Sequence, residues 1–178
     1  MPPRLLIPAL LALTWAQPRA PAAPAVPLVG VLTYEADPAE SDSVDAAIDR
    51  AVRHMGWLSR PVARRRLRLN NPQPQALSLT MSDDTVIVAL GRDAPLALPR
   101  DGNVVPWRDP EGEIVHASLA VRGDTLTQAV IGKDGRADSR FLFGDDGRHV
   151  LMSVTITSPH LPAPVVYTIG FRQTSGSP

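Results

Sequence analysis

Short runs of alternating apolar and polar residues fill the second half of this chain, and they constrain its fold more than any other feature. Two of these runs place an apolar residue at every second position: Val150, Met152, Val154 and Ile156, then Val165, Tyr167, Ile169 and Phe171. A period of two puts successive side chains on opposite faces of a β-strand. The pattern therefore predicts strands with one buried face and one polar face.

Turn signals separate the runs. Asp-Gly pairs stand at 101–102, 134–135 and 146–147, and a Gly-Asp pair stands at 123–124. These residue types suit two-residue hairpin turns in which both central residues have positive φ. The spacing predicts consecutive strands near 103–107, 113–122, 125–132, 138–143, 149–157 and 164–172.

The first half adds further strands and a helix. Val29 to Tyr34 is a candidate strand, and 77–81 with 86–90 form a predicted hairpin. The stretch 94–99 holds two prolines, which remove donors from a sheet, so it belongs on an edge or in a loop. The total is about eight or nine strands, enough for an up-and-down sheet to close.

One amphipathic helix is expected near 43–55. Its apolar positions recur every three or four residues: Val44, Ala47, Ile48, Ala51, Val52 and Met55. Asp42 or Ser43 is suited to cap its start, and Gly56 to end it. Residues 57–66 are a possible second short helix with Pro61 in its first turn, although Leu67 and Leu69, which alternate with arginines, could already be strand.

The N-terminal residues have the composition of a secretory leader. Residues 1–16 combine Arg4, a short apolar run and small residues near Ala16, which predicts a signal peptide. Residues 17–27 are rich in Pro and Ala and read as a linker, 28–174 as a single β-rich domain, and 175–178 as a disordered tail. The expected location is periplasmic or secreted, in a bacterial setting, without a membrane span, since the apolar run is shorter than the ~20 residues that a span needs.

The predicted fold is mainly β: an antiparallel up-and-down meander, curled into a barrel or half-barrel, with one N-terminal amphipathic helix. Leu28, Gly30 and Leu32 resemble the Gly-x-Trp opening of lipocalin-like barrels, without its tryptophan. The segment Asp101 to Trp107 and the closing strand 167–172 are similar to uncharacterised exported bacterial proteins of lipocalin-like type. The resemblance implies that a small apolar ligand binds in the mouth of the barrel.

Catalytic and metal motifs are not apparent. The four histidines are far apart in sequence, there is no cysteine, and neither Gly-x-Ser-x-Gly nor Ser-x-x-Lys occurs. No catalytic residue, metal site or cofactor is assigned. A hydrolase with a dispersed site would need a histidine such as His116 beside a hydroxyl or carboxylate in a cleft. The net charge of zero gives no case for nucleic acid as a partner.

Aromatic residues of the predicted strands are the candidate ligand contacts. The set comprises Trp107, His116, Phe141, Phe143 and Tyr167. Such residues on alternating strands commonly form the core, and His116 fits a core or lumen position. The other reading is that Trp107, His116 and Tyr167 edge a pocket. Both readings stay open at this point.

A basic run forms the second candidate site. Arg64, Arg65 and Arg66 could bind an anion such as an envelope phosphate or carboxylate, because guanidinium groups bind these ions in a bidentate manner. Alternatively the run is a solvated face compensated by the acidic residues between Glu35 and Asp49.

The leading functional hypothesis is an exported, non-enzymatic binding module for a small apolar or amphipathic ligand. The alternative is an envelope structural or interaction protein that uses a sheet edge or the Arg-rich face.

Overall fold

The computed structural model describes residues 29–91, 94–109 and 112–174. The predicted leader, the linker and the C-terminal tail therefore lie outside the described residues. The elements in chain order are β1 (Gly30–Asp37), the 3-10 turn η1 (Pro38–Glu40), α1 (Val44–Ala51), α2 (Ser59–Asn70), β2 (Ala76–Met81), β3 (Thr85–Leu90), β4 (Leu96–Pro99), β5 (Val105–Arg108), β6 (Ile114–Arg122), β7 (Thr125–Gly132), β8 (Gly135–Phe143), β9 (His149–Thr157) and β10 (Val165–Gln173).

All ten strands belong to one antiparallel sheet, in the order β4-β3-β2-β1-β10-β9-β8-β7-β6-β5. Each strand from β2 to β10 pairs with the next in sequence except across the β4–β5 connection, and β1 pairs with β10. The meander predicted from the alternating runs is confirmed. As expected from its prolines, the 94–99 stretch contributes the edge strand β4.

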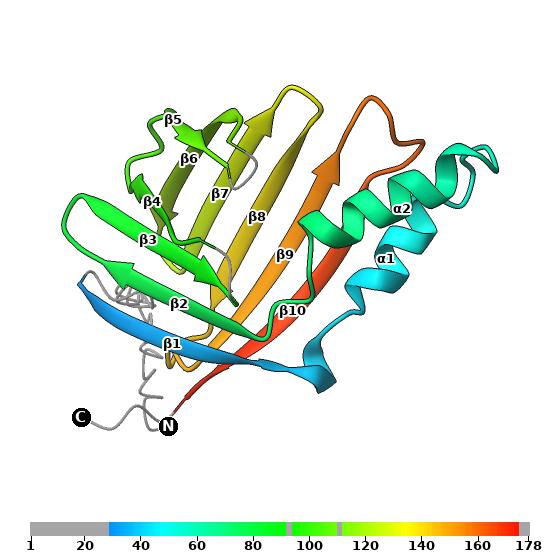
Figure 1. Ribbon diagram of the computed structural model, residues 1–178. Coiled ribbons are helices and arrows are strands. Elements are labelled where there is room, and N and C mark those ends of the chain that lie inside the picture. The colour runs from blue at the N-terminus through cyan, green and yellow to red at the C-terminus, as the bar shows by residue number, and fades with distance from the viewer. Residues whose placement is uncertain (1–28, 92–93, 110–111, 175–178) are drawn as a thin grey trace, which may run out of the picture.

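The residues after β4 bring the two ends of the sheet together. The backbone N–H of Gly102 donates to the carbonyl of Leu119 on β6 at 2.8 Å, and the N–H of Val121 donates to the carbonyl of Arg100 at 3.3 Å. Asp101 lies opposite Ala120 as an isolated bridge. These contacts curl the sheet into the nearly closed barrel seen in Figure 1.

The turns differ from the predicted type. The predicted positive φ at both central residues is wrong, because in the described part of the chain only glycines have positive φ. In the β6–β7 turn Gly123 has a φ of 59°, and Asp124 follows it without positive φ. The β7–β8 turn consists of Lys133 and Asp134, so Gly135 is already in the strand. Asp101-Gly102 is no hairpin turn at all, because it bridges to β6.

Both helices lie between β1 and β2 in sequence. In Figure 1 they lie together at the end of the barrel where β9 ends and β10 begins. Ser43 caps α1 by accepting the Ala46 N–H, and its buried face includes Val44 and Ile48. α1 ends at Ala51, one turn earlier than predicted. α2 runs to Asn70, so the alternative of a strand at Leu67 and Leu69 is wrong.

The segment between β1 and α1 fixes the helix pair to β10. Asp42 exchanges two hydrogen bonds with the Thr168 backbone, and the Ser41 hydroxyl accepts the Gly170 N–H at 3.1 Å. Asp37 accepts the Ala39 N–H and forms an ion pair with Arg172. The Ala39 hydrogen bond and then the Arg172 guanidinium lower the pKa of Asp37.

In the described residues no helix has the length and apolar character to cross a membrane.

The core is the inner surface of the barrel. It includes Tyr34, Leu79, Met152, Ile169 and Phe171, each at most 2% exposed. Val154 and Tyr167 are also buried, and Ile156 packs against the core. The α1 face joins the same cluster. The one shared inner surface predicted from period-two alternation is therefore present.

Candidate functional site

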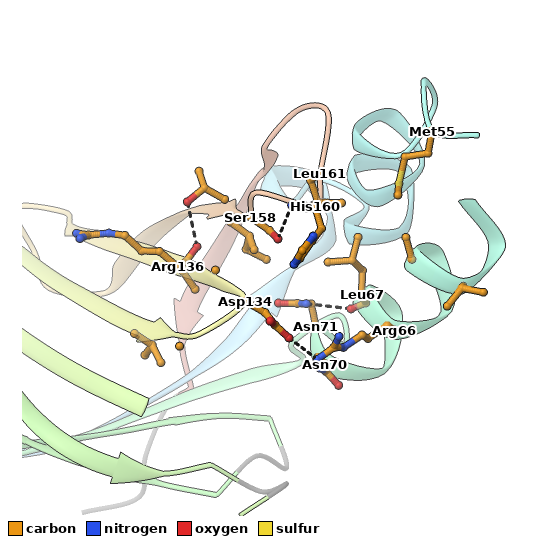
Figure 2. Close-up of a pocket in the computed structure, with 18 of the residues that line it drawn as sticks. Met55, Arg66, Leu67, Asn70, Asn71, Asp134, Arg136, Ser158, His160 and Leu161 are labelled. Carbon is orange, nitrogen blue, oxygen red and sulfur yellow. Dashed lines mark hydrogen bonds and ion pairs between the residues drawn. The ribbon is translucent and has the colours of Figure 1, made fainter. Parts of the chain in front are cut away.

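A cavity of about 550 Å³ lies between α2 and the end of the barrel. Its walls come from α2, from the β7–β8 turn and from the loop between β9 and β10, as Figure 2 shows. The barrel supplies the floor through Val130, Ala137 and Ile156, which follow one another across β7, β8 and β9. The helix pair thus covers a hollow at the mouth of the barrel.

The cavity lining is mainly apolar. Besides the floor, apolar side chains come from α2, from the turn before it and from the β9–β10 loop: Met55, Val62, Ala63, Leu67 and Leu161. None of the α2 residues is fully buried. An amphipathic helix normally buries its apolar stripe against a core. Here the inward stripe of α2 borders empty space, which a small apolar molecule could fill.

A second cavity of about 480 Å³ lies inside the barrel next to the first. Both are lined by Asn70, Val130 and Ala137, so they adjoin at these residues. Trp107 of β5 and Gln128 of β7 line the second cavity. Small-molecule sites in proteins typically measure about 300–1,000 Å³, so either cavity has a suitable size.

The opposite end of the barrel is filled with side chains. Tyr34, Phe141 and Phe171 have no exposed surface, and Tyr34 packs edge-on against Phe143 with ring centroids 6.5 Å apart. The Tyr34 hydroxyl donates to the Gly147 carbonyl at 2.9 Å. Burial, together with the nearby Asp146 carboxylate, raises the pKa of Tyr34 to about 12. Among the described residues, the two cavities above therefore lie away from this filled end.

Charged groups at the rim of the first cavity are paired with one another. Arg66 on α2 forms an ion pair of 3.1 Å with Asp134 in the β7–β8 turn. Arg136 is paired with Asp138 at 2.6 Å, and Figure 2 shows its guanidinium directed away from the helices. The Arg66–Asp134 pair joins α2 to the barrel across the cavity rim.

The five aromatic candidates do not line one pocket. Trp107 is half-buried and lines the second cavity. Phe141, Phe143 and Tyr167 are buried among the core side chains. The expected core or lumen position of His116 is wrong: it is exposed on β6, because its neighbours Val115 and Ala117 take the inward positions. It is also outside the two cavities described above.

The three arginines of the basic run have different surroundings. Arg64 pairs with Asp49 at 2.8 Å and Arg66 with Asp134, whereas Arg65 is exposed and pairs with none of the described residues. Successive helical residues point about 100° apart. Arg68 also pairs with Asp45 and Asp49, so the acids of α1 compensate part of the run. Anion binding by Arg64, Arg65 and Arg66 stays a prediction.

Apart from Arg66, the cavity-lining residues of α2 and of the β9–β10 loop were not predicted from the sequence. Ala63, Leu67 and Asn71 recur at intervals of four, which is a usable helical signal. The arginines between these positions make the helical repeat hard to recognise in the sequence. Leu161 and His160 follow no periodicity, so only the folded chain places them at the cavity.

Within the described ranges, no group of three or more His, Asp or Glu residues is placed to hold a metal ion.

The sequence matches no protein-family model and no curated protein. The fold is similar to that of a fatty-acid-binding protein in brain tissue of Drosophila melanogaster, with a TM-score of 0.51 and 17% identity over 82% of this chain and 99% of that chain. It is also similar to the REP1-NXSQ fatty acid transporter, with a TM-score of 0.51 and 14% identity over 84% of this chain and 98% of that chain. At such identities the likeness shows the fold, a lipocalin-like β-barrel.

Proposed function

We propose that this protein binds a small apolar or amphipathic ligand at the helix-covered mouth of its barrel. The observation that carries the proposal is the apolar hollow of about 550 Å³ between α2 and the floor formed by Val130, Ala137 and Ile156. Burying apolar ligand surface there is favourable by roughly 25 cal/mol per Å². Two proteins of the same fold are described as a fatty-acid-binding protein and a fatty acid transporter, which supports a ligand with an acyl or alkyl chain.

The binding step follows from the arrangement of the walls. α2 is not part of the sheet that forms the floor, and it contacts the β7–β8 turn through the exposed Arg66–Asp134 pair. A small outward movement of α2 would open a path to the floor without breaking a strand pairing. Return of the helix would then exclude water from the bound ligand.

Titration with the neutral dye Nile red tests this function. The dye should bind saturably, one per chain, with increased fluorescence. Ala137→Phe places a bulky side chain in the space shared by both cavities and should weaken binding at least about tenfold, because the ligand must give up buried apolar surface. The control Ile131→Phe alters the exposed, outward neighbour of the floor and should bind normally. Equal binding by the two variants, or no saturable binding by the parent chain, would refute the proposal.

A second candidate function is docking to an anionic envelope lipid surface. Four large apolar residues in and beside α2 are mostly exposed, with values of 81% for Trp57, 67% for Leu58, 68% for Val62 and 71% for Leu69. The exposed Arg65 lies on the same helix. Apolar side chains beside cations suit the surface of an anionic membrane. Sedimentation with phosphatidylglycerol vesicles should fall sharply for Arg64→Ala/Arg65→Ala/Arg66→Ala, and unchanged sedimentation would discard this candidate.

We also propose that the chain is exported and cleaved after Ala16, which places the mature protein in the periplasm or outside the cell. The composition of residues 1–16 supports this. N-terminal sequencing of protein recovered from the periplasmic fraction of a bacterial host should begin at Gln17. Recovery of an uncleaved chain from the cytoplasm would contradict export.

A further inference from the structure

The polar side chains inside the barrel suggest which kind of ligand it takes. Apart from the exposed Gln173 at the end of β10, the inward positions of the described strands are apolar or glycine except for Tyr34, Gln128, Ser139 and Tyr167. Tyr34 is at the filled end, with its hydroxyl bonded to Gly147. Gln128 instead lines the second cavity, where Trp107 and Val130 also lie. Its amide is thus placed where the polar end of a ligand could reach it.

The amide of Gln128 has no hydrogen-bond partner among the described residues, although its side chain is half-buried. Ser139 lies directly opposite it on β8, and its hydroxyl makes no hydrogen bond within the same part of the chain. Side chains opposite each other on paired strands have Cβ atoms about 4.5–5.5 Å apart. Because the Gln128 side chain is only half-buried and lines the second cavity, its amide is open to a molecule that enters there. Ser139 lines neither cavity, so Gln128 supplies the polar group there: its amide offers two N–H donors and one carbonyl acceptor to a molecule in the second cavity.

The charges around the cavities argue against an ionised head group. No buried charged side chain occurs in the described residues. Arg66 and Arg136 at the rim already pair with carboxylates. Asp109 also lines the second cavity, so a carboxylate there would face a like charge. Removing a carboxylate from water without a counterion is very unfavourable.

We infer that the Gln128 amide binds an uncharged hydrogen-bonding head group, and that the protein selects neutral amphipathic lipids, such as long-chain alcohols or amides, over ionised fatty acids. This inference rests on the proposed function, since it names the ligand class for the same site. The alkyl chain lies over Val130 and Ala137 toward α2. The hydroxyl or amide then points into the barrel, toward Gln128.

Displacement of Nile red by ligands of equal chain length tests the inference. At pH 8, dodecan-1-ol and dodecanamide should displace the dye at concentrations at least about tenfold lower than dodecanoate, because only the carboxylate loses hydration without a counterion. As the pH falls through about 4–5, dodecanoate becomes neutral and its affinity should rise toward that of the alcohol. The affinity of the alcohol should change little over the same range.

Variants of Gln128 provide the second arm. Gln128→Met preserves the side-chain volume and removes the amide, so it should weaken alcohol and amide binding about three- to tenfold, with the Nile red affinity of each variant measured first so that displacement is converted to affinity. Gln128→Leu also removes the amide, and it replaces Gln128→Met in this test if the Met variant folds poorly. The control Thr127→Val alters the exposed neighbour and should bind all ligands normally. Stronger binding of dodecanoate at pH 8, or equal affinities in Gln128→Met and the control, overturns the inference but leaves the proposed function standing. Failure of Nile red and all three ligands to bind overturns both.

Discussion

Close backbone contacts decide which single residues the barrel mouth tolerates. Gly135 begins β8, and a Cβ atom added there would lie 2.4 Å from the carbonyl oxygen of Thr157. Because that oxygen belongs to the backbone of β9, it cannot move aside without disturbing the sheet. We expect Gly135→Ala to lower the free energy of unfolding by about 1–3 kcal/mol, measured by urea denaturation. Gly56→Ala is the matched control, since its nearest contact is a serine hydroxyl at 3.6 Å, and a comparable loss there would contradict the steric explanation.

Burial of the Tyr34 hydroxyl links stability to alkaline pH. Its pKa is about 12 in the folded chain, whereas an unfolded tyrosine titrates near 10. The unfolded state therefore loses the proton first. The stability from the neutral hydroxyl is fully present below about pH 10 and is lost progressively as the pH rises toward 12.

Unfolding free energies of the parent chain and of Tyr34→Phe, measured from pH 8 to pH 12, test this coupling. The variant should be about 1 kcal/mol less stable at pH 8, since it lacks the hydrogen bond to Gly147. The difference should shrink or reverse above pH 10. Parallel curves up to pH 12 would show that Tyr34 is not the group responsible.

At the scale of elements, the contact between α2 and the barrel is weak where a ligand would pass. Arg66 and Asp134 form an exposed pair, and such pairs contribute at most about 1 kcal/mol. Asp134→Asn should therefore change stability little but accelerate release of Nile red in stopped-flow measurements. Glu113→Gln breaks the exposed pair with Lys133, which does not involve α2, and should leave the release rate unchanged. Equal rates in both variants would show that the Arg66–Asp134 pair does not control access.

The same helix shows where sequence reasoning fails. The start and the buried face of α1 were predicted well because its apolar residues repeat at helical spacing and Ser43 caps it, whereas its end at Ala51 was not. α2 has no fully buried residue and four arginines between positions 64 and 68, so its periodicity is faint, and Leu67 and Leu69 could be taken for a strand. A helix that covers a cavity rather than a core lacks the strong apolar stripe on which such predictions depend.

At the scale of the whole molecule, the alternation of apolar and polar residues determined the barrel, and the bounds of β7 and β9 match the sequence prediction. Alternation also distinguishes inward from outward residues, and it correctly predicts that Val154 and Ile169 are buried. It did not show which half of the barrel is filled, since both halves carry inward apolar residues. That depends on side-chain size and on where the helix pair lies, which is set by the Asp42 and Ser41 contacts with β10.

The position of a bound ligand is the most direct test of binding at the barrel mouth. We suggest measuring intermolecular nuclear Overhauser effects between dodecan-1-ol and methyl-labelled protein. We expect contacts from the alkyl chain to the methyl groups of Val130, Ile156 and Leu161, and none to the outward, exposed Leu151 and Val166. Contacts confined to the exposed Leu58 at the start of α2, with none to Val130 or Ile156, would contradict binding at the barrel mouth.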